Sequence, residues 1–517
     1  MADAAAPAPR SSQVSFLHNV AWGWLGVGVN IVVSLVMAPL LIRRLGVDQY
    51  GLWVLLFSAV EYLRMLDFGF RAATVNACAR FRARKDWEGV NRTIATAALY
   101  FLVIGIVCCA TAIGLRDVLI DALNVPPQHQ AIARTLVLLI ALSVSFRLIL
   151  SPFTSALEAF QRYDLVNQAY ISALVLRSTG SISLLLLGYG LVEIATVIMI
   201  AQIGENVLTI ISVRRVVPAF RVSASLVRTE VLTQLFRYGR HSAVWVIAQV
   251  LSLQVPNTVI GFLLGPVAVG FFALPLRLLL YVSEALTKVS DVTSSVTAEL
   301  DETRSTAKVW RLAVLTNRNS LALFMPAAIF LAVYSMPLLT VWISSEVAAN
   351  SGPLIPVMLI NFVLAVAGQH NAGAILLGQG KHARYAYANV LELILSTIGL
   401  LLVVPRFGIL GAAWVLTIAE LLTRGVYLAV LTCRLNGFAL REYVAAIYAR
   451  PLLTAVPVLL GAVALRETVW AGSGWLELIA AALVIAGTYF GIALFSVVEH
   501  DHRQRLRTWL RPSARAH

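Results

Sequence analysis

The stretch LIRRLGVDQYGLW, residues 41–53, lies between two apolar segments that are each long enough to cross a bilayer. It contains Leu-Gly, four further residues and a second Gly, beginning at Leu45. The same pattern recurs 219 residues later as LGPVAVGFF, beginning at Leu264. The first copy follows the first apolar segment and the second copy follows the seventh. A turn that recurs after six segments predicts two lobes of six helices each, with the same topology.

The composition is that of a membrane protein. Of the 517 residues, 59% are hydrophobic and 13% are charged, whereas roughly 25% of the residues of a soluble protein are charged. Apolar segments bounded by charge, Gly or Pro predict an all-α polytopic membrane protein with 14 transmembrane helices. The predicted segments begin near residues 16, 49, 92, 131, 166, 193, 242, 268, 313, 354, 385, 408, 452 and 476.

The repeat and the segment count together predict the domain organisation. Two lobes of six spans are followed by two further spans, and the first residues form a disordered cytoplasmic tail. The predicted parts are the tail at 1–15, an N-lobe at 16–213, a cytoplasmic linker at 214–241, a C-lobe at 242–432, spans 13 and 14 at 433–498, and a basic tail at 499–517.

The net charge of +14 comes from basic loops on one side of the membrane. If both termini are cytoplasmic, the cytoplasmic loops and tails hold 26 of the 40 Lys and Arg residues and the opposite loops hold 5. This asymmetry follows the positive-inside rule and predicts cytoplasmic termini. The basic clusters at 79–92, 213–241 and 500–517 are expected to touch anionic membrane lipids. No nucleic-acid partner is expected, because no nucleic-acid-binding module is recognisable.

The sequence carries no pattern of an enzyme. It has no Asp-x-Asp or Walker motif and no convincing Ser/His/Asp set, and the predicted external loops reach only about 20 residues. Cysteines lie within or at the ends of apolar segments, without the spacing of a metal site or a disulfide framework. We therefore expect no catalytic residues, no metal and no cofactor. The four cysteines are Cys78, Cys108, Cys109 and Cys433.

Arginines near the middle of predicted spans are the first candidate binding residues. Charges at bilayer depth are costly and usually face a bundle interior or a water-filled cavity. A guanidinium group can hold a phosphate through two parallel hydrogen bonds. The predicted cationic site therefore suits a phosphate-bearing substrate, and its arginines are Arg64, Arg147, Arg177 and Arg277.

Two spans that correspond under the repeat carry polar stripes. In the eighth span, residues at steps of three and four fall on one helical face, which must line protein or water. The second span has a looser stripe with Tyr62 beside it. The stripe of the eighth span is Arg277, Tyr281, Glu284, Lys288, Asp291 and Ser295, and that of the second span is Glu61, Arg64, Asp67 and Arg71.

These stripes allow two interpretations. The charges can be internal ion pairs that join helices, since the members of the second-span stripe are three or four residues apart. They can instead line a central cleft, where arginines and tyrosines bind the substrate and the carboxylates of Glu61, Asp67 and Glu284 exchange protons. Helix breakers at Pro152, Pro256, Pro275 and Pro326 are candidate hinges.

The paired arginines of the opening stretch also have two readings. Arg43 and Arg44 come at the outer end of the first span, the side that disfavours arginine. They can anchor a helix C-terminus and reach outer-leaflet phosphates, or form a cationic outer rim of the transport site. The glycines, Gly46 and Gly265, suit helix C-caps in both copies of the turn.

Residues 41–70 resemble the start of the bacterial oligosaccharide flippases, the Wzx-like polysaccharide-export group of the MOP superfamily. The matching motifs are Pro39-Leu40-Leu41, Arg43/Arg44, Leu45-Gly46, Tyr50-Gly51-Leu52-Trp53 and Asp67-Phe68-Gly69, and FGILGAAW at 407–414 is also similar. The resemblance implies a MATE-like fold and a flippase of the bacterial inner membrane. Its substrate would be an undecaprenyl-diphosphate-linked oligosaccharide for polysaccharide, lipopolysaccharide O-antigen or exopolysaccharide synthesis. It would move this substrate to the periplasmic leaflet by alternating access, with polymerase or export machinery as further partners.

Other functions remain open at this point. Within the same superfamily, the alternatives are a lipid II flippase and a multidrug antiporter, although arginines at the midplane disfavour a cationic drug. From other classes, the alternatives are a membrane polysaccharide polymerase or glycosyltransferase, and a non-transporting assembly partner. A scaffold needs no charged interior, so the arginines favour transport.

Overall fold

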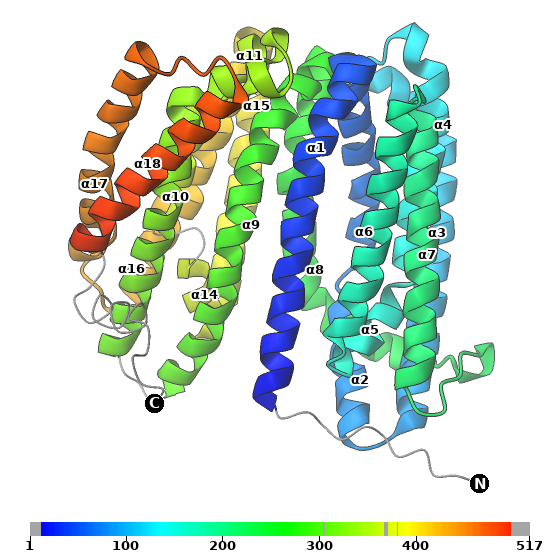
Figure 1. Cartoon of the computed structure of the whole chain (residues 1–517). Coiled ribbons are helices and arrows are strands. Elements are labelled where there is room, and N and C mark those ends of the chain that lie inside the picture. Colours follow the sequence, from blue (N-terminus) through cyan, green and yellow to red (C-terminus); the bar gives the residue numbers. More distant parts are fainter. Residues whose placement is uncertain (1–11, 303–305, 367–370, 380, 498–517) are drawn as a thin grey trace, which may run out of the picture. The chain divides into compact units, whose positions relative to one another are not determined.

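The protein is described by a computed structural model, shown in Figure 1, which covers residues 12–302, 306–366, 371–379 and 381–497. Every secondary-structure element in these ranges is a helix, which confirms the all-α class. Nine of the described helices are long and apolar enough to cross a membrane, or ten if one bent pair is a single span. The described chain is therefore multi-pass, and the number of 14 spans stays a prediction.

The chain divides by its contacts into unit 1, residues 1–270, and unit 2, residues 271–517. The predicted six-span lobes and their boundaries stay a prediction. Unit 1 contains α1 (Ser12–Glu61), η1 (Tyr62–Asp67), α2 (Phe70–Ala83), α3 (Trp87–Ala122), α4 (Pro127–Ile149), α5 (Ser151–Ala159), α6 (Tyr163–Leu186), α7 (Leu191–Val216), η2 (Ala224–Leu226), α8 (Thr229–Leu264) and the first turn of α9 (Pro266–Glu302).

The helices of unit 1 pack in a closed series. Helix α3 lies against α4, α4 against α7, α7 against α6, and α6 against α1, as Figure 1 shows for the neighbouring blue and green helices. Helix α8 packs on α1, α2 and α3. Exposed apolar side chains such as Ile106, Val118 and Leu187 cover the outside of these helices, as expected of a surface that faces lipid.

The two copies of the repeated turn have the same backbone. Gly46 separates two helical segments within α1 with a φ of 90°, and Gly265 ends α8 with a φ of 83°. Both values lie where glycine is favoured, which agrees with the predicted capping role. Oδ2 of Asp48, two residues after Gly46, lies 2.9 Å from Nε2 of His129 at the start of α4. This contact ties the first turn to its neighbouring helix.

The second glycines of the two turns lie against each other. A Cβ atom on Gly51 would come within 1.9 Å of the Pro266 carbonyl oxygen, and one on Gly270 would come within 2.7 Å of the Val47 carbonyl oxygen. The backbones of the two turns therefore cross with no room for a side chain. This contact explains why each turn has a glycine at the end of the pattern.

Unit 2 is built around α10 (Thr306–Trp342). Helices α17 (Leu440–Thr468) and α18 (Trp475–Ser496) pack on α10 and on each other, and α12 packs between α10 and α15. The non-helical Gly408 divides α15 into two helical segments, and a π-helix, η3, continues it. The other described elements are α11 (Ser345–Ser351), α12 (Leu354–Leu364), α14 (Asn371–Gly378), α15 (His382–Glu420), η3 (Leu421–Tyr427) and α16 (Leu428–Asn436).

We predict that Gly51→Ala destabilises the protein by about 1–3 kcal/mol, the usual effect of forcing a methyl group into a packed contact. The new Cβ would overlap the Pro266 carbonyl. Thermal unfolding in detergent measures the change. Gly114→Ala is the matched control, because a Cβ there has no atom within 4 Å. Equal melting temperatures for the two variants would contradict the close crossing.

Candidate functional site

The second predicted span is broken at its middle. Helix α1 ends at Glu61, a 3-10 helix runs from Tyr62 to Asp67, and α2 begins at Phe70. Between them, Phe68 and Gly69 have φ values of 46° and 74°. A non-glycine residue with positive φ is uncommon and often marks a functional position. Irregular backbone at membrane depth needs partners from other helices, or a water-filled cavity.

Neighbouring helices supply partners to this break. The Tyr100 hydroxyl donates to the Leu66 carbonyl oxygen at 2.9 Å. Gly239 of α8 lies so close that a Cβ there would be 2.8 Å from the Phe68 carbonyl oxygen. The ring of buried Phe70 stacks on Tyr100 with 3.8 Å between centroids and meets Phe236 edge-on at 4.6 Å. The break is thus held from α3 and α8.

A second break lies beside the first. Helix α4 ends at Ile149 and α5 starts at Ser151, with Pro152 in its first turn. Helix α4 contacts η1, and α5 contacts α2. Pro152 therefore lies at a helix break, as a helix breaker should, while its role as a hinge stays a prediction. The two breaks bring the charged side chains of both spans together.

Glu61 is shared by two of the predicted arginines. It pairs with Arg64 at 3.0 Å, and Arg147 of α4 donates from Nη2 to its other carboxylate oxygen. The Glu61 side chain is 15% exposed, whereas those of Arg64 and Arg147 are 51% and 45% exposed. The carboxylate is thus enclosed, and both guanidinium groups keep open surface. The structure thus brings Arg64 and Arg147 to one carboxylate, whereas the sequence predicted only that the two arginines share a depth in the membrane.

Arg71 has a different partner. Its Nη2 donates to Glu158 Oε1 of α5 at 2.5 Å, and its backbone N–H donates to Asp67 Oδ1 at 3.2 Å. Glu158 was not predicted, because it stands alone near the end of an apolar segment. The Asp67 contact is local, as the spacing of the stripe predicts.

The remaining predicted residues of unit 1 lie around this group. The Arg177 guanidinium stands 5.3 Å from the ring centroid of Tyr170. Glu205 of α7 interacts electrostatically with both Arg177 and Arg147, and it too was missed from the sequence. Tyr62 instead donates to the Thr258 hydroxyl of α8 at 3.0 Å. The arginines of unit 1 thus form a network with carboxylates rather than an isolated positive cluster.

The stripe of the eighth span lies in unit 2. Arg277 is exposed and Tyr281 is partly buried. The side chains of Glu284, Lys288, Asp291 and Ser295 are outside the described part of the structure. The predicted face formed by these residues and its role stay a prediction.

The paired arginines of the opening stretch, Arg43 and Arg44, are both exposed just before Gly46. Their position at the end of the first helical segment of α1 is the one predicted. Both an anchor and an outer rim remain hypotheses.

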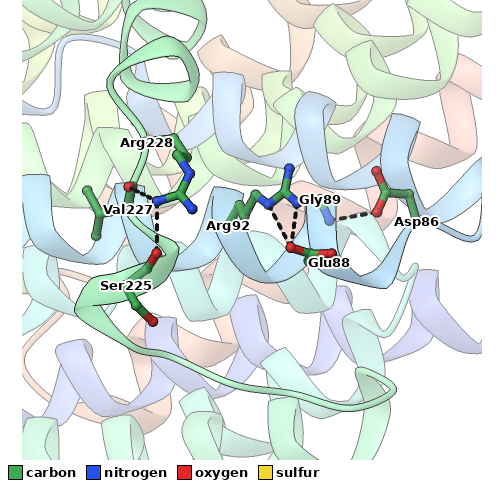
Figure 2. Close-up of polar contacts among 7 residues, drawn as sticks. All are labelled: Asp86, Glu88, Gly89, Arg92, Ser225, Val227 and Arg228. Atoms are coloured by element: carbon green, nitrogen blue, oxygen red, sulfur yellow. Dashed lines mark hydrogen bonds and ion pairs between the residues drawn. The ribbon is translucent and has the colours of Figure 1, made fainter.

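Residues of two predicted basic clusters, 79–92 and 213–241, are held by local contacts, which Figure 2 shows. Arg92 donates to Glu88 one turn earlier, and Asp86 caps α3 by accepting from the Gly89 N–H at 2.8 Å. Arg228 donates to the carbonyl oxygens of Ser225 and Val227 at 2.8 and 2.9 Å. These contacts order the α2–α3 turn and the segment before α8.

The loop between α5 and α6 is held in the same way. Arg162 donates to both oxygens of Asp164, at 2.9 and 2.8 Å. These hydrogen bonds raise the pKa of Arg162. The guanidinium therefore keeps its charge in this loop, which is predicted to be cytoplasmic.

Comparison with known proteins identifies the class. Residues 16–292, more than half of the chain, match the model of the family described as "Polysaccharide biosynthesis protein", and the chain belongs to this family. A Shigella flexneri protein named "Putative O-antigen transporter" is 19% identical over 413 residues, covering 77% of this chain and 94% of that protein. This membership confirms the resemblance to a polysaccharide family that residues 41–70 predict.

Solved structures share the fold. The lipid II flippase MurJ in its inward closed conformation has a TM-score of 0.72 at 12% identity, covering 93% of this chain and 98% of that chain. A MATE family multidrug resistance transporter in the inward-facing conformation has a TM-score of 0.65 at 16% identity, covering 79% and 95%. These similarities confirm the MATE-like fold.

We predict that Phe70→Ala destabilises the protein by about 3–5 kcal/mol, the usual cost of removing a buried phenylalanine. Phe70 is fully buried between Tyr100 and Phe236 at the break. Phe262→Ala on α8 is the control, since that ring is 53% exposed. The measurement is thermal unfolding in lipid nanodiscs, and a loss no larger than that of the control would argue against the aromatic packing.

Proposed function

We propose that the protein is a flippase that moves an undecaprenyl-diphosphate-linked oligosaccharide from the cytoplasmic to the periplasmic leaflet of the bacterial inner membrane. The observation that carries the proposal is the Glu61 carboxylate shared by Arg64 and Arg147 at two helix breaks. Membership of the polysaccharide biosynthesis family and similarity to an O-antigen transporter support the substrate class.

The arginine geometry suits a diphosphate. Two half-exposed guanidinium groups already hold a shared oxyanion, Glu61, between them. A diphosphate offers more acceptor oxygens and more negative charge, so it can replace the carboxylate on both arginines. Arg71 and Arg177 extend the positive charge from α2 and α6. Tyr62 is proposed to assist the same site from η1, and Arg277 and Tyr281 remain candidates in unit 2.

The direction of transport and the orientation belong to the same proposal. The excess of Lys and Arg in alternate loops supports cytoplasmic termini. The lipid tail of the substrate would stay in the bilayer while its charged head passes through the protein, which is how a flippase differs from an exporter of soluble drugs. A polymerase or other export machinery would accept the product on the outer side.

A lipid II flippase is the second candidate, because lipid II shares the diphosphate that the arginines suit. The fold similarity to MurJ is compatible with either substrate. A multidrug antiporter fits less well, since guanidinium groups repel organic cations. Genetics separates the two flippases, because loss of a lipid II flippase blocks cell-wall synthesis rather than polysaccharide export.

We predict that Arg64→Ala and Arg147→Ala each lower transport by about 10- to 100-fold, the loss of one charge-assisted hydrogen bond of 1.5–3 kcal/mol. The measurement is rescue of a deletion strain that accumulates lipid-linked repeat units on the cytoplasmic side. Arg134→Ala is the matched control, because Arg134 also lies on α4 and is also paired, with Asp117 at 2.7 Å.

Normal rescue by both variants at matched protein levels would overturn the proposed diphosphate site. Accumulation of unpolymerised units already in the periplasm would place the defect after transport and would contradict the flippase itself.

We further predict that Glu61→Gln tightens binding of undecaprenyl diphosphate by about tenfold, which corresponds to about 1.4 kcal/mol. The neutral amide no longer competes as an anion for the two arginines. Tryptophan fluorescence titration of the purified protein measures the dissociation constant. Glu88→Gln is the control, because Glu88 lies in the first turn of α3 and pairs with Arg92. Weaker binding after Glu61→Gln would contradict the proposal that the Glu61 carboxylate occupies the place of the diphosphate on the two arginines.

A further inference from the structure

Unit 2 contains a charged cluster that the proposed function does not use. Its members come from α12, α15 and the π-helix η3, and they are largely buried: Glu392 is 4% exposed and Asn361 is 2% exposed. Glu420 and Arg424 complete the cluster. Charges are rarely placed inside a membrane protein without a function.

Glu392 and Arg424 form a two-pronged ion pair. Arg424 donates from Nε to Glu392 Oε2 and from Nη2 to Oε1, the latter at 3.1 Å. Both carboxylate oxygens of Glu392 are therefore engaged by one planar guanidinium group. This pairing compensates the charge of Glu392.

Glu420 lies one helical turn before Arg424 and adds a second carboxylate. Asn361 of α12 donates to its Oε2. Among the described residues, the charged groups that interact with Glu420 are Glu392, which repels it, and Arg424, which attracts it. Two carboxylates thus face one guanidinium group. Among the described residues of this cluster, one negative charge is left in excess, and this is costly where the dielectric constant is low.

Asn361 supplies a second, independent observation. Its side-chain oxygen is buried and accepts no hydrogen bond from the described residues, although its amide nitrogen donates to Glu420. A buried acceptor without a donor is unfavourable. A carboxylic acid in place of the carboxylate can make two bonds with this amide, because it accepts from Nδ2 with one oxygen and donates its hydroxyl to Oδ1 with the other.

The backbone at this place is also unusual. The π-helix Leu421–Tyr427 starts directly after Glu420 and contains Arg424. Single π-helical turns within α-helices are rare and are frequently found at functional sites. Thr423, in the same turn, is fully buried and donates to the Ala419 carbonyl oxygen at 2.7 Å. The irregular turn therefore sets the spacing of the acid and the arginine.

We propose that Glu420 is the proton-binding site of unit 2. A proton from water adds to Oε1 of Glu420, removes the excess negative charge and donates to Asn361 Oδ1, and the reverse step returns it to water. The Glu392–Arg424 pair positions the site. The inference stands on unit 2 alone and does not depend on the substrate proposed for unit 1.

Infrared difference spectroscopy of the purified, reconstituted protein tests this proposal. A protonated carboxylic acid has a carbonyl stretch that a carboxylate lacks, so titration from acidic to alkaline pH should remove the band of Glu420. Glu420→Gln should abolish this band. Glu346→Gln, at an exposed position in the first turn of α11, should leave it unchanged. Persistence of the band in Glu420→Gln would overturn the assignment.

Two further measurements keep the test decisive. If Glu420→Gln does not fold, Asn361→Val removes the acceptor, and the band of the remaining acid should shift in frequency; an unshifted band would contradict the acid–amide contact. Titration with Na⁺ or K⁺ at fixed pH should leave the wild-type band in place. Loss of the band with either ion would overturn a proton site in favour of a metal-cation site.

Discussion

A helix that breaks inside hydrocarbon leaves backbone groups without intrahelical partners, and the arrangement of unit 1 follows from meeting this requirement. The break at residues 62–69 is held by Tyr100 from α3 and by the close approach of Gly239 on α8. The same interruption turns Arg64 toward the carboxylate that Arg147 also binds. The irregular backbone and the charged network are therefore one structural feature.

The sequence left two interpretations of the charged stripe open, internal ion pairs and a binding site, and the charged network bears on both. Glu61 and Arg64 are three residues apart and form a local ion pair, yet the same carboxylate reaches Arg147 on another helix. Both guanidinium groups stay about half exposed, while the carboxylate between them is enclosed. An enclosed anion with exposed cations around it is an arrangement that a stronger anion can enter.

Sequence predicted the features that depend on local chemistry. The glycines of the repeated turn and the helical class follow from spacing and hydropathy, and the structure has positive φ at Gly46 and Gly265. The partners did not follow, because Glu61 and Arg147 are 86 residues apart. Glu392 stands alone in its apolar segment, 32 residues before Arg424, so no periodic pattern in the sequence connects the two. The left-handed Phe68 carries no local signal either.

The crossing of Gly51 with Pro266 and Gly270 has a consequence for the history of the chain. If the two turns descend from one ancestral turn, each copy has since been constrained by the other, because their second glycines meet backbone to backbone. At the crossing, a larger residue in either half would have been blocked by the backbone of its twin.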